Sequence, residues 1–388
     1  MQGNKGISSK VAWEGRYSQM EEKYYYWIHN VAGIGKETLK KLLEVATPQE
    51  LFDGSLKNIE VLLKKKQLEN LEESRSKWNL EAEWKALQRR KICFSYYGSE
   101  NYPYKLKEIP DPPLALYMKG KTEFFSKPAV AVVGARNCSA YGGLAAKELG
   151  KELAEMGIVV VSGMARGIDG ICQWAALERG GESIGVLGSG VEVCYPKENR
   201  AIYERLQEKG CLVSENPPFT QPRAGLFPMR NRIISGLADV VVVVEAREKS
   251  GTLITVDMAL EQGKEVFAMP GRMTDRDSRG CNRLIKQGAG MVLSPREFIE
   301  EICPILKLEY QKKETKTEKN SNENISKEEN RILKLIETEP KNIEEIYGEL
   351  RKELPEIPLG KMMENLLQLK VKQKVEEREG YYYAFKEK

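Results

Sequence analysis

The chain has 388 residues, of which 41% are hydrophobic, so it can bury the cores of two or three domains. A net charge of +4 is too small to indicate a nucleic-acid partner by itself, and seven scattered cysteines with a single histidine, His29, exclude the usual spacings of a zinc site. We find neither a secretory signal nor an apolar run long enough to cross a membrane. We therefore expect a cytoplasmic protein with reduced thiols, with no metal, no cofactor and no membrane association.

Arginine is enriched in the middle of the chain. Between Pro128 and Ile302, 14 of the 21 basic residues are arginine, whereas the whole chain holds 21 Arg and 40 Lys. Because a guanidinium can bind two phosphate oxygens at once, this enrichment favours fixed phosphate contacts. Surface ion pairs would account for about half of these arginines equally well.

The first hundred residues are predicted to contain a polar extension, 1–19, and then a helical domain, 20–100. The turn Ala32-Gly33-Ile34-Gly35 separates two helical stretches and resembles the hairpin of a helix-hairpin-helix module. In one interpretation its glycines let the backbone approach a DNA phosphate. In the other it is an αα-hairpin in which glycine supplies a positive φ, and the sequence leaves both open.

Short β-branched runs alternate with helical stretches from Ala129 onward. Strands that are apolar throughout are typical of a parallel sheet covered on both faces. We therefore predict an α/β domain over 101–306, a Rossmann-like doubly wound parallel sheet whose ligand lies beyond the carboxyl ends of the strands. The predicted strands are 129–134, 158–163, 183–190, 211–215, 239–246 and 265–271.

The last part of the chain is predicted to be a separate small domain. A stretch of Lys, Glu, Asn, Ser and Thr over 307–325 has the composition of a solvated linker. Three helical patterns and an alternating segment with a central turn follow over 326–388. They indicate a winged-helix-like domain, which could bind duplex DNA or proteins equally well.

Three predicted strands run into turns rich in glycine and small polar residues. A helix N-terminus presents unpaired N–H groups, and glycine lets an anion come close to them. Three such turns side by side predict an extended phosphate-binding rim. The turns contain Gly134, Arg136 and Ser139; Ser162 and Gly163; and Lys249, Ser250, Gly251 and Thr252.

The segment from Phe227 to Gly236 is the strongest single motif, because two arginines flank Asn231 at the start of a predicted helix. Arginine forks hold phosphates, an asparagine can hydrogen-bond a base edge, and a phenylalanine can stack on a base. Arg230 and Arg232 are two positions apart and so point in different directions. We expect at most one of them to face DNA and the other to tie the helix to the sheet.

The signatures of nucleotide-dependent enzymes are absent from the sequence. There is no Gly-x-x-x-x-Gly-Lys-Ser/Thr, and no Gly-x-Gly-x-x-Gly follows the first strand. His29 is far in sequence from the α/β domain, which excludes a Ser-His-Asp arrangement there. We expect a protein that binds rather than catalyses.

An ordered series of motifs between Tyr102 and Val292 resembles the DNA-processing protein A (DprA, also called Smf) family. The motifs include VGAR, SGMARGID, GSGVEVCYPKEN, FPMRNRIISGLAD, KSGTLIT and GCNRLIKQGA. The resemblance implies a protein that binds single-stranded DNA, forms a homodimer and loads the recombinase RecA during natural transformation. By motif it assigns DNA contacts to Arg136, Lys197, Asn199, Arg230, Asn231 and Arg232.

The main rival is a nucleotide N-glycosidase of the phosphoribohydrolase type, which shares the fold. Lys249 to Thr255 is similar to the second half of the Pro-Gly-Gly-x-Gly-Thr-x-x-Glu turn of those enzymes. However, Thr255 stands where their catalytic glutamate belongs, so the acid/base group is missing. A second rival is an adaptor that only binds proteins, which would show no salt-dependent affinity for an oligonucleotide.

Overall fold

The structure of the protein, a computed structural model, describes residues 22–309, 326–336, 339–372, 374–378 and 380–384. The chain divides into two compact units, Met1–Tyr310 and Gln311–Lys388. The predicted extension 1–19 and positions 310–325 of the predicted linker lie outside the described residues. None of the helices in the described ranges is long and apolar enough to cross a membrane.

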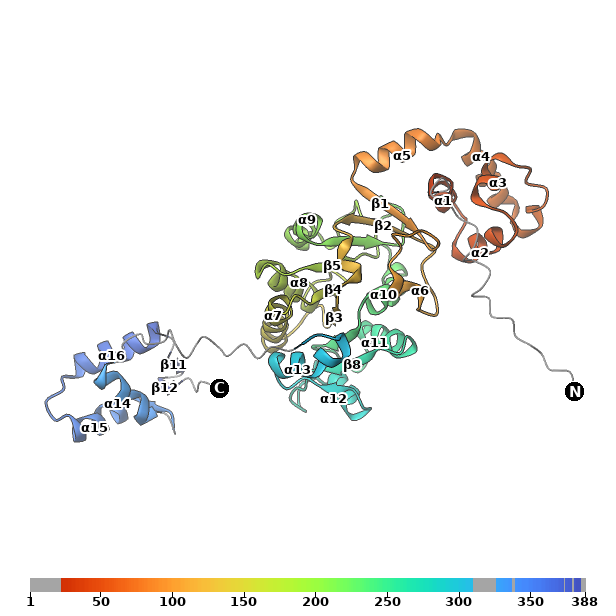
Figure 1. Ribbon diagram of the computed structural model, residues 1–388. Helices are drawn as coiled ribbons and strands as arrows, with labels where there is room; N and C mark the ends of the chain where they lie inside the picture. The colour runs from red at the N-terminus through yellow and green to blue at the C-terminus, as the bar shows by residue number, and fades with distance from the viewer. Residues whose placement is uncertain (1–21, 310–325, 337–338, 373, 379, 385–388) are drawn as a thin grey trace, which may run out of the picture. The chain divides into compact units, whose positions relative to one another are not determined.

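A nine-stranded sheet forms the centre of the first unit (Figure 1). Its order is β1-β2-β6-β5-β4-β3-β7-β8-β9, and the seven strands from β6 to β9 in this order are parallel to one another. The predicted α/β fold with a mostly parallel sheet is therefore confirmed. The strands are β1 (Ile92–Tyr96), β2 (Ala115–Gly120), β3 (Ala129–Val133), β4 (Val159–Ser162), β5 (Ser183–Val186), β6 (Cys211–Ser214), β7 (Val240–Val243), β8 (Glu265–Ala268) and β9 (Gly290–Met291).

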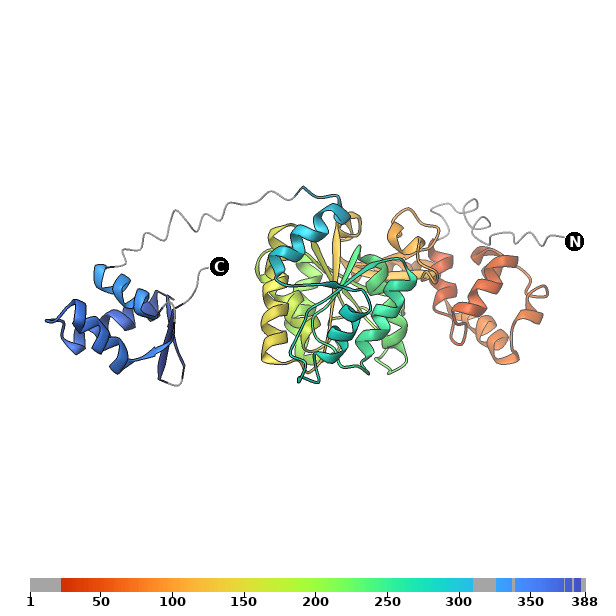
Figure 2. The ribbon, with the colours of Figure 1, turned by 90° about the horizontal axis from the view of Figure 1, so that it is seen from below.

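Helices cover both faces of this sheet, as a doubly wound fold requires (Figure 2). One face packs against α7 (Ala140–Glu155), α8 (Ile168–Glu178) and α13 (Pro295–Leu306). The other face packs against α10 (Leu226–Leu237), α11 (Gly251–Glu261) and α12 (Arg279–Lys286). A further helix, α9 (Arg200–Lys209), packs on β2 and β6. The central strands are buried on both sides, which explains their continuous valine runs.

Three strands of this sheet, β1, β2 and the two-residue β9, were not predicted. β1 and β2 form an antiparallel hairpin, and β2 pairs antiparallel with β6, so they extend the parallel sheet at one edge. β1 falls inside the segment that the sequence assigns to the helical domain. The Tyr117 ring of β2 lies near Phe94 of β1 and Tyr26 of the first helix, so the hairpin joins the helical region to the sheet.

Among residues 22–91, five α-helices precede β1 and share a separate core that contains Trp27, Ile28, Leu42 and Leu71. Between the first two, Gly33 has φ +80°, and side-chain amides of Gln67 and Asn70 donate to the carbonyls of Gly33 and Ala32. These contacts support the αα-hairpin interpretation, and the DNA contact of this turn stays a prediction. The helices are α1 (Glu22–His29), α2 (Lys36–Val45), α3 (Pro48–Asp53), α4 (Lys65–Lys77) and α5 (Leu80–Arg89).

The second unit contains the three helices and the β-hairpin expected from the sequence. A three-stranded sheet of order β10-β12-β11 packs with the helices around Ile332, Ile346, Leu366 and Tyr382. Its elements are α14 (Lys327–Ile336), β10 (Lys341–Asn342), α15 (Ile343–Glu353), α16 (Leu359–Val371), β11 (Val375–Arg378) and β12 (Tyr381–Ala384).

Candidate nucleic-acid interface

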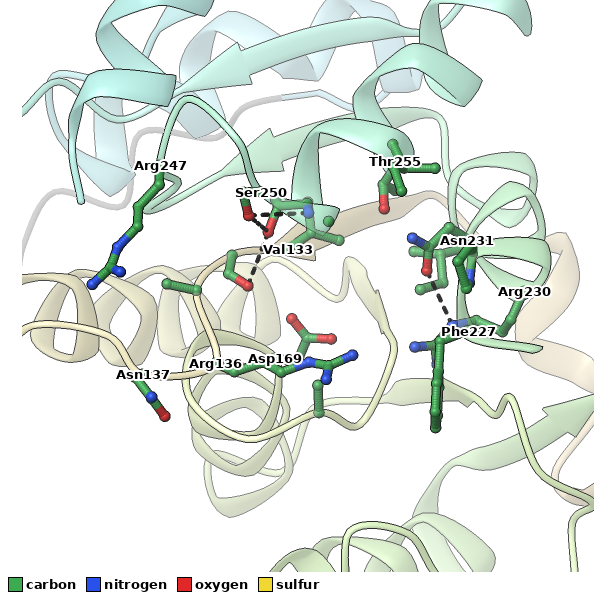
Figure 3. Close-up of a pocket in the computed structure, with 18 of the residues that line it drawn as sticks. Val133, Arg136, Asn137, Asp169, Phe227, Arg230, Asn231, Arg247, Ser250 and Thr255 are labelled. Atoms are coloured by element: carbon green, nitrogen blue, oxygen red, sulfur yellow. Dashed lines mark hydrogen bonds between the residues drawn. The ribbon is translucent and has the colours of Figure 1, made fainter. Parts of the chain in front are cut away.

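A cavity of about 740 Å³ lies at the carboxyl ends of β3, β4 and β7 (Figure 3). β3 is the central strand of the three, with β4 on one side and β7 on the other, so the cavity sits where the winding of the sheet reverses. Nine of the fifteen site residues predicted from the sequence line it. They are Gly134, Arg136, Phe227, Arg230, Asn231, Lys249, Ser250, Gly251 and Thr252.

Arg230 is held at the floor of this cavity by main-chain carbonyls. Its side chain donates to the carbonyl of Gly163 at 2.8 Å and to that of Val186. A Cβ on Gly163 would lie 2.6 Å from the guanidinium, so only glycine allows this approach. Burial lowers the pKa of Arg230 to about 10, although nearby Asp169 opposes the shift, and the positive charge of Arg136 lowers that pKa further.

Asp169 is a buried carboxylate beside this arginine. One of its oxygens accepts the Gly163 N–H at 3.1 Å, and burial raises its pKa while the charge of Arg230 acts against that rise. The Asp169 carboxylate is thus engaged by groups of the protein itself. It fixes the turn after β4 and balances part of the charge of Arg230.

The lining of the cavity is positive overall. Asp169 and Asp277 are its acidic residues, and Asp277 forms an ion pair with Arg247. Among the described residues, no ion pair is formed by Arg136 or Lys249, both of which are exposed. The four basic lining residues, which exceed the acidic ones by two, are Arg136, Arg230, Arg247 and Lys249.

An aromatic pair lies at one side of the cavity. The ring of Phe227 is 5.5 Å from that of Tyr195, with the planes 31° apart, and the guanidinium of Arg136 is 5.6 Å from the Phe227 centroid. Figure 3 shows the Arg136 side chain extending toward Phe227. The Tyr195 side chain is 43% exposed, so a planar ligand could reach this pair.

The turn before α11 forms another part of the lining. Ser250 caps the helix, because its hydroxyl oxygen accepts the N–H of Thr252 at 3.2 Å. The Thr252 hydroxyl donates to the carbonyl of Gly134 at 3.2 Å and so ties this turn to the end of β3. Nothing lies within 4 Å of a Cβ placed on the exposed Gly251, which leaves open space at the helix start.

At the other two glycine turns, groups that were predicted to bind phosphate are hydrogen-bonded within the protein. The N–H of Ser139 at the start of α7 donates to the buried carboxylate of Glu245 at 2.8 Å. At the β4 turn, the N–H of Met164 donates to the side chain of Gln173 at 3.1 Å, and the hydroxyl of buried Ser162 donates to the carbonyl of Val132. Internal acceptors thus occupy groups that the sequence assigns to phosphate, and Ser139, Ser162 and Gly163 do not line the cavity.

Three further predicted residues also lie outside the cavity lining. Lys197 is exposed in the short segment that follows Tyr195. The Asn199 side chain donates to the carbonyls of Met164 and Ala165 at 3.0 and 2.9 Å, so it joins that segment to the β4 turn. The Arg232 guanidinium binds the carboxylate of Glu215 at 2.7 Å and that of Asp111 at 3.0 Å, as the expected structural arginine of the pair would.

Comparison with known proteins identifies the family of this chain. The family model of DNA recombination-mediator protein A matches residues 93–303, which is more than half of the chain. The chain belongs to this family. The resemblance to DprA and Smf proteins stated from the motifs is therefore confirmed.

Individual members of the DNA recombination-mediator protein A family align over most of their length. DNA processing protein DprA of Bacillus subtilis is 45% identical over 206 residues, which are 53% of this chain and 69% of that one. The X-ray structure of DprA from Streptococcus pneumoniae has a TM-score of 0.63 at 33% identity and covers 74% of this chain and 99% of its own. A Helicobacter pylori DprA structure, described for its single-stranded DNA binding mode, has a TM-score of 0.50 at 31% identity, covering 54% of this chain and 96% of its own.

The sequence assigned no role to several residues of the cavity, among them Asp169, Tyr195 and Arg247. Asp169 belongs to the SGMARGID motif and Tyr195 to the YPKEN segment, so both were inside recognised motifs but had no assigned role. Arg247 precedes Lys249 by two positions and was not considered. An aromatic residue beside a basic segment is the signal that could have indicated Tyr195.

Proposed function

We propose that this protein binds single-stranded DNA in the cavity at the carboxyl ends of β3, β4 and β7. The observation that carries the proposal is the excess of positive charge in the lining, with Arg230 buried and Arg136 close enough to lower its pKa. A phosphate between these two guanidiniums would relieve their repulsion and form charge-assisted hydrogen bonds. The single-stranded DNA binding mode described for the Helicobacter pylori relative supports the same ligand class.

A single strand fits this site better than a duplex. Phe227 and Tyr195 offer ring faces next to the cationic Arg136, and bases can stack on such rings only when they are not paired within a helix. The cavity would then bind the backbone through arginine while the aromatic pair binds a base. A duplex would offer only its phosphates.

The proposal is one of binding without turnover. Thr255, at the position of the glutamate in the glycosidase turn, lines the cavity and is 2% exposed, and the Asp169 carboxylate is engaged by Gly163 and Arg230. No acid/base group is therefore placed at the α11 turn. Incubation with nucleoside monophosphates should release no free base, and a release that depends on Gly251 would support the glycosidase alternative instead.

We further propose that the protein loads RecA onto the strand and forms a homodimer. Both proposals rest on the family resemblance. For the dimer, one feature of the sheet adds support. The edge strand β9 is only two residues long, and Met291 and Leu293 beside it are 44% and 65% exposed. An open sheet edge with apolar side chains is suited to contact with a second copy. We also keep the expectation of a cytoplasmic protein, because DNA processing takes place there.

The experiment that tests the proposal is a titration of a labelled single-stranded oligonucleotide with the full chain at several salt concentrations. Affinity should fall as salt rises, with a slope of about 0.7 for each phosphate neutralised. Binding that does not depend on salt, or no binding, would contradict the proposal. Adding RecA to the same titration tests whether the protein loads RecA, because a loader should increase the amount of RecA on the strand.

A further inference from the structure

The helix α12 contains basic residues but no acidic residue. Its sequence RGCNRLIK contains three basic residues and no acidic one. Arg279, Arg283 and Lys286 are all exposed, and their spacing of four and three positions places them on one side of the helix. We call these three residues the basic face of α12.

Several basic residues on other surface helices of the first unit pair with an acidic residue within one turn. Examples are Lys77 with Glu73, Lys151 with Glu148 and Arg296 with Glu300. Among the described residues, no ion pair is recorded for any member of the basic face of α12. Three exposed positive charges thus remain for a ligand from solution.

The opposite side of α12 is firmly attached to the rest of the unit. The N–H of Gly280 donates to the carbonyl of Ala246 at 2.8 Å, and a Cβ there would lie 2.6 Å from that oxygen. Cys281 is fully buried, and the Asn282 side chain both donates to the carbonyl of Gly271 and accepts its N–H. The basic face therefore has a fixed orientation toward solvent.

The basic face begins next to the cavity. Asp277, two residues before α12, lines the cavity and pairs there with Arg247. Arg272 and Arg276 in the preceding loop are exposed as well, but Asp275 and Asp277 lie in the same loop, so the net positive charge of this segment belongs to α12. At about 1.5 Å per residue the eight residues of α12 span about 12 Å, enough to lie along a few phosphates of a single strand.

We propose that the basic face of α12 binds phosphates of the strand that leaves the cavity, so that the DNA site extends from the cavity along this helix. The inference rests on the proposed function, since it needs a strand in the cavity. A row of charges can also be a solvated surface, and in that case its removal leaves the affinity for the strand unchanged.

The test uses the full chain and the triple variant Arg279→Gln, Arg283→Gln, Lys286→Gln. A control variant with the same change in charge carries Lys77→Gln, Lys151→Gln and Arg296→Gln, which remove basic residues that already have acidic partners. Both variants are titrated with single-stranded oligothymidylates of about six and about twenty nucleotides, one within and one beyond the common site sizes of about 4 to 16 nucleotides. Melting temperatures check that all proteins are folded.

The triple variant should bind the long oligonucleotide at least ~10-fold more weakly than the parent, with a salt slope smaller by about 2. It should bind the short one as the parent does, and the control variant should match the parent with both. Equal affinity and slope of the two variants for the long oligonucleotide would overturn the extended site. If Arg136→Ala alone then weakens both lengths, the cavity proposal stands without the extension, whereas a parent that binds neither length overturns both proposals.

Discussion

Arg230 and Arg232 are two positions apart in α10, and their guanidiniums have different kinds of partner. Arg230 donates to the main-chain carbonyls of Gly163 and Val186 at the cavity, whereas Arg232 binds the carboxylates of Glu215 and Asp111 outside it. Successive positions of an α-helix turn by about 100°, so residues two apart point away from each other. One motif thus serves both the cavity and the stability of the fold.

Arg232→Ala should mainly destabilise the protein. The side chain is 4% exposed, and its loss leaves the Glu215 carboxylate without the guanidinium nitrogen that donates to both of its oxygens. We expect a loss of roughly 2 to 4 kcal/mol in the free energy of unfolding, below the full cost for a buried pair because Asp111 is partly exposed. Urea unfolding measures it. Unchanged stability together with lost oligonucleotide binding would mean that Arg232 contacts the DNA.

Arg136→Ala should weaken binding and leave stability unchanged. The side chain is exposed at the cavity and forms no ion pair among the described residues, so its loss removes a phosphate contact worth roughly 1 to 3 kcal/mol. The salt slope should fall by about 0.7. Fluorescence anisotropy with a single-stranded oligonucleotide measures both, and Lys151→Ala is the control. A folded variant with the parent's slope would remove Arg136 from the site.

Phe227→Leu should separate stacking from charge. Replacing the ring removes the base platform beside Tyr195 but no charge, so affinity for a single strand should fall by roughly 1 to 3 kcal/mol at an unchanged salt slope. Affinity for a duplex should change little. The same anisotropy titrations at several salt concentrations provide the measurement. A change of slope as large as that of Arg136→Ala would show that the ring acts by positioning Arg136 and not by stacking.

His29 should make stability depend on pH. It is partly buried, with its Nδ1 3.0 Å from the Tyr117 hydroxyl, and desolvation lowers its pKa from 6.5 to about 4. The unfolded chain therefore binds the proton more readily, so stability contributed by neutral His29 is complete above pH 6.5 and is lost as the pH falls toward 4. Between pH 7 and pH 5 the parent should lose about 2 kcal/mol more than His29→Gln, measured by urea unfolding. Parallel pH profiles would show that His29 does not titrate differently on folding.

The parallel strands were predictable because each is a continuous apolar run. β3 and β7 lie within the predicted segments, since burial on both faces leaves an unambiguous signal. The hairpin β1-β2 was missed, because its strands mix polar and aromatic residues at the join with the helical region. Short runs of such mixed composition cannot be separated from loops and helices by pattern alone.

The site was predicted only in part, because the sequence shows which residues follow the strands but not which of their groups have distant partners. Glycines and arginines after strands indicate where a ligand can approach, and nine predicted residues do line the cavity. Which backbone N–H groups remain available depends on distant partners: Glu245, which binds the N–H of Ser139, is 106 positions away. Such pairs arise only when the sheet brings the ends of β3 and β7 together.

The most direct test of the central claim compares a single strand with a duplex of the same sequence, both titrated with the full chain at one salt concentration. A site made of buried arginine, exposed arginine and a stacking pair should bind the single strand at least ~10-fold more tightly, and Phe227→Leu should reduce this preference. Equal affinity for the two forms, unchanged in Phe227→Leu, would contradict the assignment of this cavity as a single-stranded DNA site.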